Sequence, residues 1–138
     1  KGIINNTPID IYNNGNMYRD FTYIDDIVKG IYLLINKIPN KKQIGKYKND
    51  SLSNIAPFRI LNIGNSNKVL LLNFLKEIEN RLNKKSIRKY MPLQKGDVKK
   101  TLSNINLLKS LTKYNPKTSY KNGIEKFIKW YKYYYKLD

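Results

Sequence analysis

The chain has 138 residues and a formal net charge of +17, from 27 Lys and Arg against 10 Asp and Glu. Such a length, within about 100–200 residues, is typical of one domain or of part of a larger protein. The sequence contains neither Cys nor His, which excludes disulfides, Cys/His zinc sites, a cysteine nucleophile and a Ser-His-Asp triad. No apolar run reaches the ~18–20 residues of a membrane span, and no basic and apolar leader opens the chain. We therefore expect a cytoplasmic protein and, because no initiator Met is present, a fragment or a processed chain.

The positive charge comes almost entirely from lysine, since arginine occurs only at Arg19, Arg59, Arg81 and Arg88. A basic balance of this size invites a nucleic-acid-binding interpretation. However, Lys, Asn, Ile and Tyr are all plentiful here, and their codons are rich in A and T. We favour a compositional bias of the genome over selection for polyanion binding, and we keep a basic nucleic-acid-binding module as the alternative function.

The first forty residues predict a hairpin followed by a helix. Residues 8–12 and 17–23 have the character of strands, and the Asn-Gly pair within residues 13–16 tolerates positive φ in a turn. Asp25 and Asp26 follow at the start of a helix, where carboxylates cap free N–H groups. The helical spacing predicts one apolar face that comprises Ile24, Ile27, Ile31, Leu34, Ile35 and Ile38.

The rest of the chain alternates between helical and extended patterns. We predict, in order, a polar loop at 41–57, a strand at 58–63, a helix at 68–83, a strand at 86–91, a short helix capped by Asn104 and ending at Leu111, and a helix at 120–136. This alternation indicates an α/β fold.

Acidic residues show no pattern typical of catalysis. Asp25 and Asp26 are neighbours, so on a helix they point about 100° apart and do not share one site. Glu77 and Glu79 lie on different faces of the predicted helix, and we expect both to be exposed to solvent. A hydrolase that uses two carboxylates is therefore not expected. Neither a GxGxxG nor a GxxxxGK[ST] phosphate loop occurs.

The last predicted helix combines aromatic residues with lysines, a combination that can hold single-stranded nucleic acid. Ile124, Phe127, Ile128, Tyr131 and Tyr135 form one stripe at helical spacing, and the lysines form the opposite one. This amphipathic pattern favours packing of the apolar stripe over nucleic-acid binding.

Two other places suggest recognition of a phosphate or a sugar. Arg19 lies in a predicted extended segment, and its planar guanidinium suits phosphate, although an ion pair with Asp20 or another carboxylate explains it equally well. Gly96 permits a tight turn that would present the Gln94 amide and the Asp97 carboxylate together. Such a pair suits sugar hydroxyl groups, and an ordinary surface turn is the alternative.

Four segments resemble the NAD-dependent nucleotide-sugar epimerases, which are extended short-chain dehydrogenases/reductases. These segments are RDFTYIDDIV at 19–28, LNIGNS at 61–66, MPLQKGDV at 91–98 followed by Thr101, and GIEKFIKWY at 123–131. They occur in the order of the family and near its spacing. The Gln-x-Gly-Asp-Val form resembles most closely the UDP-glucuronate 4-epimerases.

The resemblance implies that residues 1–138 are the C-terminal, substrate-binding region, with small mixed strands and packed helices but without the N-terminal Rossmann core. In the family, that core carries the Gly-rich loop that binds NAD and a catalytic Tyr-x-x-x-Lys pair. We therefore expect NAD to be bound mainly outside this chain and the isolated chain to be inactive. The family commonly forms homodimers through the absent region, so the resemblance leaves the oligomeric state open.

The resemblance also assigns roles to four residues. Arg19 would contact the diphosphate of a UDP-sugar, Gln94 and Asp97 would hold the ribose or phosphate end of the nucleotide, and Thr101 would lie near the substrate pocket. It does not distinguish UDP-glucuronate from other UDP-sugars or dTDP-sugars.

Overall fold

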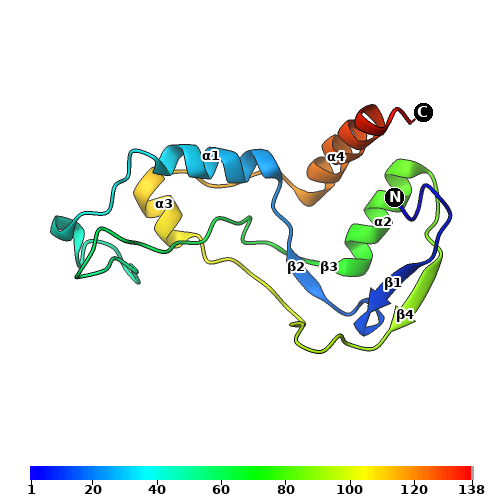
Figure 1. Cartoon of the computed structure of the whole chain (residues 1–138), viewed down its shortest axis with the longest axis horizontal. Helices are drawn as coiled ribbons and strands as arrows, with labels where there is room; N and C mark the ends of the chain where they lie inside the picture. The colour runs from blue at the N-terminus through cyan, green and yellow to red at the C-terminus, as the bar shows by residue number, and fades with distance from the viewer. Residues whose placement is uncertain (138) are drawn as a thin grey trace. The chain divides into compact units, whose positions relative to one another are not determined.

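The computed structural model describes residues 1–137, which divide between two compact units (Figure 1). Of the described residues, unit 1 comprises 1–19, 68–101 and 119–137, and unit 2 comprises 20–67 and 102–118. The predicted combination of small strands and packed helices is confirmed. No helix among the described residues is long and apolar enough to cross a membrane.

Unit 1 is built on strands that pair with distant parts of the chain. β1 (Ile9–Tyr12) pairs in parallel with β4 (Arg88–Met91), with Ile9 opposite Arg88 and Tyr12 opposite Met91. A second pair joins β2 (Tyr18–Asp20) to β3 (Lys68–Leu70). The predicted hairpin over residues 8–23 is therefore wrong, because β1 and β2 belong to different two-stranded sheets.

The turn between these strands explains the error. Asn13–Gly15 forms the 3-10 turn η1, in which Asn13, Asn14 and Gly15 have φ of 48°, 51° and 78°. The predicted positive φ is confirmed, but the turn redirects the chain instead of pairing its neighbours. A Cβ on Gly15 would lie 2.5 Å from the Leu72 side chain, so both the space and the backbone conformation require glycine here.

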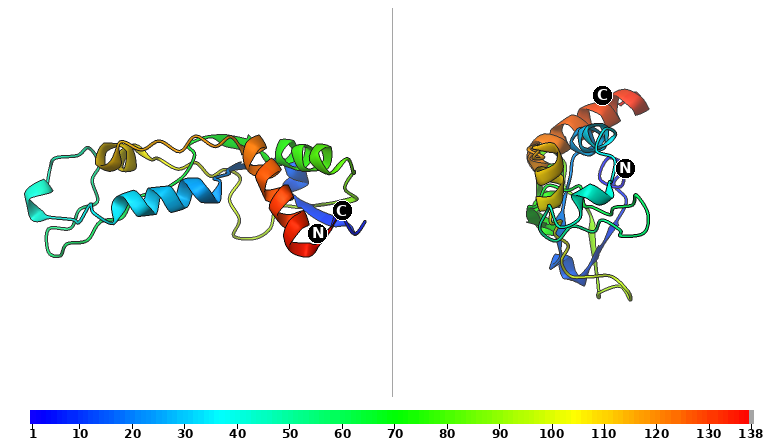
Figure 2. Two further views of the ribbon diagram at one scale, coloured as in Figure 1. Left: turned by 90° about the horizontal axis from the view of Figure 1, so that it is seen from above. Right: turned by 90° about the vertical axis from the view of Figure 1, so that its left-hand side faces the viewer.

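Two helices supply the core of unit 1, α2 (Leu71–Leu82) and α4 (Tyr120–Tyr135), which lie side by side (Figure 2). The helix predicted at 68–83 begins three residues later, because Lys68–Leu70 forms β3. Apolar residues at helical spacing on α2 pack against the N-terminal segment, and each buried aliphatic side chain stabilises the fold by about 1.5–3 kcal/mol. The cluster consists of Ile3, Ile9, Ile11, Leu72, Leu75, Ile78 and Leu82.

Unit 2 contains α1 (Ile24–Leu34), α3 (Asn106–Thr112) and the short 3-10 helix η2 (Lys41–Gln43). Ile105, Leu108 and Leu111 are buried in this unit. The N-cap position of α3 belongs to Ile105 and not, as predicted, to Asn104; Asn104 Oδ1 accepts a hydrogen bond from the backbone N–H of Asn106 one residue before that position. In unit 1, Ser119 is the N-cap of α4, and its side chain accepts a hydrogen bond from the N–H of Asn122.

The apolar face predicted for α1 is largely exposed, which corrects the expectation of a packed face. Ile24, Ile31 and Ile35 are 60%, 54% and 64% exposed. Asp26 and Gly30, one helical turn apart, are the buried residues of α1. A Cβ on Gly30 would lie 3.0 Å from the Ile63 side chain, so the helix packs closely within its unit at this glycine, while Ile27 is half-buried.

The strand predicted at 58–63 is also absent. The backbone of residues 58–60 instead forms hydrogen bonds with the preceding loop. The N–H of Ile60 donates to Ser51 Oγ, and the carbonyl of Phe58 accepts from the N–H of Ser53. The Arg59 guanidinium forms a buried ion pair with Asp50 at 2.9 Å. These contacts hold the segment against residues 50–53, and no neighbouring strand pairs with it among residues 1–137.

Candidate substrate-binding site

Arg19 forms an ion pair with Asp97, with 2.7 Å between Arg19 Nη2 and Asp97 Oδ1. The side chains are 24% and 36% exposed, so both can be reached by a solute. Arg19 Nη1 also donates to the carbonyl oxygen of Tyr18 at 3.0 Å, which fixes the plane of the guanidinium. Two residues that were singled out separately in the sequence, 78 positions apart, are therefore in direct contact.

Asp20, the other partner considered for Arg19, is engaged elsewhere. Its Oδ2 accepts the backbone N–H groups of Ser66 and Ser103 at 3.1 and 2.9 Å, and its Oδ1 accepts that of Asn67 at 3.3 Å. These bonds tie together the loops of unit 2. Asp20 thus has a structural role, and the neighbouring Arg19 forms its ion pair with Asp97.

The predicted turn at residues 94–97 is present. The N–H of Asp97 donates to the carbonyl oxygen of Gln94 at 3.2 Å, and Gly96 has a φ of 82°. Asp97 Oδ1 also accepts its neighbour's N–H, that of Val98, at 2.7 Å, which holds the carboxylate beside Arg19. Gln94 and Asp97 are exposed at the two ends of this turn.

The segment after the turn runs beside β2. The N–H of Tyr18 donates to the carbonyl of Lys99 at 2.9 Å, and the N–H of Thr101 donates to the carbonyl of Tyr18 at 3.1 Å. Tyr18 and Lys100 thus form a parallel bridge, and Lys100 Nζ lies 5.5 Å from the centre of the Tyr18 ring.

Successive side chains of an extended segment point to opposite faces. Tyr18 and Lys100 share one face, as their contact shows, and Arg19 and Asp97 share the other. By the same alternation Thr101 falls on the face of Arg19. Arg19, Asp97 and Thr101 are thereby brought together in unit 1, with Gln94 at the far end of the adjoining turn.

The structure corrects the expected arrangement of α4. Ile124 and Ile128 are buried, but Phe127 and Tyr135 of the predicted apolar stripe are 50% and 54% exposed. Trp130 stacks on Tyr134 with 5.4 Å between ring centres. The helix packs against the rest of unit 1 over a narrower arc than the sequence pattern suggested, so part of its aromatic surface remains open.

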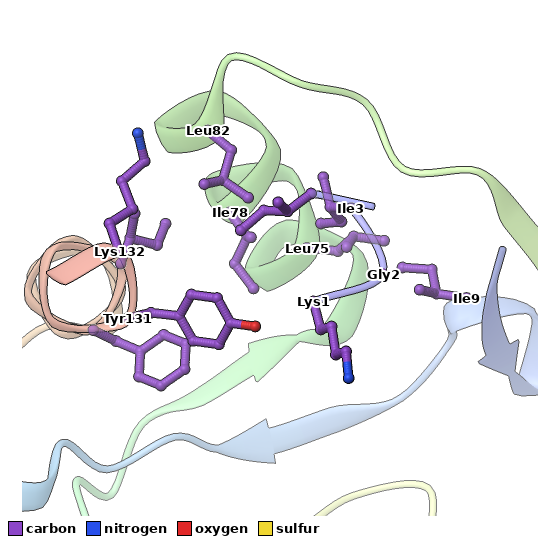
Figure 3. A pocket seen from close by; sticks show the side chains of 12 residues that line it. Lys1, Gly2, Ile3, Ile9, Leu75, Ile78, Leu82, Tyr131 and Lys132 are labelled. Atoms are coloured by element: carbon purple, nitrogen blue, oxygen red, sulfur yellow. The ribbon is translucent and has the colours of Figure 1, made fainter. Parts of the chain in front are cut away.

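An apolar pocket of about 250 Å³ lies between the N-terminal segment, α2 and α4 (Figure 3). Leu75, Ile78 and Leu82 of α2 point into it, and Tyr131 and Lys132 border it from α4. Lys132 was expected on the side opposite the apolar stripe. The lining offers no cluster of polar groups that would orient a nucleotide.

Glu79 is 2% exposed, which contradicts the expectation of a solvated side chain. Its oxygens accept two hydrogen bonds from Arg88 Nη2, both at 2.9 Å, and one from the N–H of Ser86 at 2.9 Å. Burial alone would raise the pKa of Glu79, but the hydrogen bonds from Ser86 and Arg88 outweigh it and lower the pKa to about 2. The carboxylate is a structural anion that joins α2 to β4.

Asp26 was expected to cap its helix, but its side chain instead binds residues some ninety positions away. Asp26 Oδ1 accepts from the Tyr114 hydroxyl at 2.8 Å, and Oδ2 accepts from the N–H of Thr118 at 2.9 Å. Burial opposes the charge, yet these bonds lower the pKa of Asp26. Burial and the bond to Asp26 raise the pKa of Tyr114 to about 12. Sequence periodicity could not reveal either long-range network.

No group of three or more Asp and Glu among residues 1–137 is arranged to hold a metal ion. The described residues also contain no Gly-rich turn between a strand and a helix, so they offer no cradle for the pyrophosphate of a dinucleotide. What the geometry of unit 1 does offer is a guanidinium, a carboxylate, a hydroxyl and an amide within reach of solvent.

Comparison with known proteins gives these groups a context. Residues 1–56 match the NAD dependent epimerase/dehydratase family. The chain is 45% identical over 138 residues to Protein CapI of Staphylococcus aureus, covering 99% of this chain and 41% of that protein. It is 40% identical over 131 residues to a probable UDP-glucuronate 4-epimerase of Rhizobium meliloti, covering 94% and 38%. The predicted resemblance to nucleotide-sugar epimerases is confirmed.

The fold agrees with this relationship. The crystal structure of UDP-glucuronic acid 4-epimerase from Bacillus cereus, in complex with UDP-glucuronic acid and NAD, superimposes with a TM-score of 0.72 at 22% identity. The match covers 94% of this chain and 38% of that one. The chain thus spans about two-fifths of the length of the proteins that it matches.

Proposed function

We propose that the chain is the C-terminal, substrate-binding region of an NAD-dependent nucleotide-sugar 4-epimerase and that its substrate is a UDP-sugar such as UDP-glucuronate. The observation that carries the proposal is the contact of Arg19 with Asp97 on one exposed face, beside the turn that begins at Gln94. Relatives that are 40% and 45% identical support the same assignment.

Each group has a chemical role in this proposal. The Arg19 guanidinium donates hydrogen bonds to the diphosphate. Asp97 accepts from ribose hydroxyls through the oxygen that Arg19 does not occupy, and the Gln94 amide can both donate and accept at the nucleotide end. Thr101 offers a hydroxyl on the same face. These contacts bind and orient the substrate but do not themselves move a hydride.

NAD supplies hydride chemistry when it is bound, and residues 1–137 contain no Gly-rich turn between a strand and a helix that would cradle its pyrophosphate. The proposal therefore assigns the dinucleotide and the reacting groups to the remainder of a longer protein. It follows that the 138-residue chain binds a UDP-sugar without converting it.

Calorimetric titration with UDP-glucuronate tests the proposal, using the unchanged chain and the Arg19→Lys and Arg19→Gln variants. We expect Arg19→Lys to weaken binding by about tenfold, because an ammonium cannot reproduce the two-pronged contact of a guanidinium. Arg19→Gln should weaken it further. Equal affinity in all three proteins would contradict the proposal, and so would epimerisation by the purified chain with added NAD.

A second candidate function draws on the open aromatic surface of α4. Phe127, Trp130 and Tyr134 are each at least half exposed in a helix that also carries lysines. Such rings can stack on the bases of single-stranded nucleic acid. In that case Trp130→Ala would abolish a strongly salt-dependent binding of oligonucleotides, and Arg19→Lys would leave it unchanged.

A further inference from the structure

The positive charge of Arg19 on the proposed binding face already has a counter-charge. Arg19 is the guanidinium on that face, and Asp97 already neutralises it at 2.7 Å. A diphosphate carries a negative charge on each phosphate, so the pair as it stands offers that group little net attraction. If Arg19 and Asp97 both contact the nucleotide, another cation must balance the diphosphate.

Three lysines lie in the segment that joins the turn to Thr101, and they differ in placement. Lys100 is on the opposite face, with its ammonium 5.5 Å from the centre of the Tyr18 ring. Lys95 lies within the turn itself, where the strand alternation does not apply. Lys99 lies at a bend, two residues from both Asp97 and Thr101, and directly before the residue that forms the bridge with Tyr18.

The backbone of Lys99 is held in this position. Its carbonyl oxygen accepts the N–H of Tyr18, the residue before Arg19, at 2.9 Å. Lys99 is exposed, and no ion pair engages it in the part of the chain that the structure describes. The backbone of Lys99 is therefore fixed beside the residue that precedes Arg19, and its ammonium group forms no ion pair among residues 1–137.

We propose that Lys99 supplies the second positive charge for the diphosphate of the nucleotide sugar, beside Arg19. The inference rests on the proposed function and extends it by a residue that the family resemblance does not assign. Lys99 acts as a point charge, whereas Arg19 orients the phosphates through the paired N–H donors of its planar guanidinium. Binding therefore needs the cation at position 99 but not a particular shape of side chain.

The test compares Lys99→Gln with Lys100→Gln, which removes the same charge from the adjacent residue, whose ammonium group lies over the Tyr18 ring. Calorimetric titration at low salt with UDP-glucuronate and with uridine separates the phosphate contribution from that of the nucleoside. We expect Lys99→Gln to weaken UDP-glucuronate binding by about tenfold and Lys100→Gln by less than about twofold. Uridine binding should be unchanged in both, and Lys99→Arg should restore the affinity for UDP-glucuronate.

The outcomes separate this inference from the function on which it rests. If Arg19→Lys weakens binding but Lys99→Gln does not, the role of Lys99 is overturned and the proposed function stands. Equal losses in Lys99→Gln and Lys100→Gln would indicate diffuse attraction by a basic surface and would also overturn it. If the unchanged, folded chain binds no UDP-glucuronate, both proposals fail. Far-UV circular dichroism of each variant establishes that it is folded.

Discussion

Glu79 of unit 1 and Asp26 of unit 2 are both buried carboxylates, but their partners differ in charge. Arg88 and Ser86 surround Glu79, whereas the Tyr114 hydroxyl and the N–H of Thr118 bind Asp26. Both pKa values are lowered in spite of burial. Hydrogen bonds are thus sufficient to keep a carboxylate ionised inside a small unit. Where the partner is itself charged, removing the carboxylate also leaves that partner as an uncompensated buried charge, which destabilises the fold further.

Glu79→Gln should give the largest loss of stability. The amide can still accept from Ser86, but Arg88 would remain partly buried without its counter-charge, which costs about 3 kcal/mol. Urea unfolding followed by far-UV circular dichroism measures the change. Glu77→Gln is the matched control, since Glu77 lies on the same helix and, at 14% exposure, pairs with the more exposed Arg81. A loss no larger than that of the control would remove the distinction between the two carboxylates.

Acid should reproduce much of this loss without a mutation. The pKa of Glu79 is lowered in the folded chain to about 2 from 4.5, so the stabilisation is fully present above 4.5 and disappears as the pH falls towards 2. A shift of this size corresponds to about 3 kcal/mol at most. Unfolding at a series of pH values should show a steeper acid decline for the unchanged chain than for Glu79→Gln. Parallel pH profiles would contradict the assignment.

Tyr114→Phe should have a smaller effect, about 1 kcal/mol, because it removes one neutral donor and leaves Asp26 bonded to Thr118. The same measurement on Asp26→Asn and on the double variant gives the coupling between the two side chains. We expect the two single losses to sum to more than the loss in the double variant. Strict additivity would mean that the 2.8 Å contact contributes nothing.

Gln94→Ala should give the smallest change in stability of these variants. Gln94 belongs to unit 1 but lies outside both carboxylate networks, and it is exposed at the start of its turn. Its removal should change stability by less than about 0.5 kcal/mol, as is usual for a surface site. Weaker UDP-glucuronate binding by this equally stable variant would then report on recognition alone.

Local signals in the sequence located most elements of the fold. The helices at 71–82 and 120–135, the strand at 88–91 and the positive φ of the Asn-Gly turn follow from periodicity and turn chemistry over a few residues. Strand pairing does not, because β1 pairs with a segment almost eighty positions away. Alternation in β1 was therefore visible, but the identity of its neighbour was not.

The candidate site was predictable to a similar extent. Residue chemistry and the family resemblance identified Arg19 and Asp97, but not their mutual contact, since Asp20 was the nearer carboxylate in sequence. The carboxylate of Asp20 accepts three backbone N–H groups in unit 2, which only the tertiary structure reveals. The burial of Glu79 could not be predicted from the sequence for the same reason, because its partner Arg88 belongs to a different element, β4.

The stacked ring of Trp130 gives the molecule a built-in optical reporter. It is the single tryptophan of the sequence, half exposed and 5.4 Å from the Tyr134 ring, and it belongs to unit 1. Its fluorescence therefore follows one unit, whereas helical ellipticity follows both. Denaturation curves that coincide for the two signals would show that the units unfold cooperatively. Curves that separate would give each unit a stability of its own.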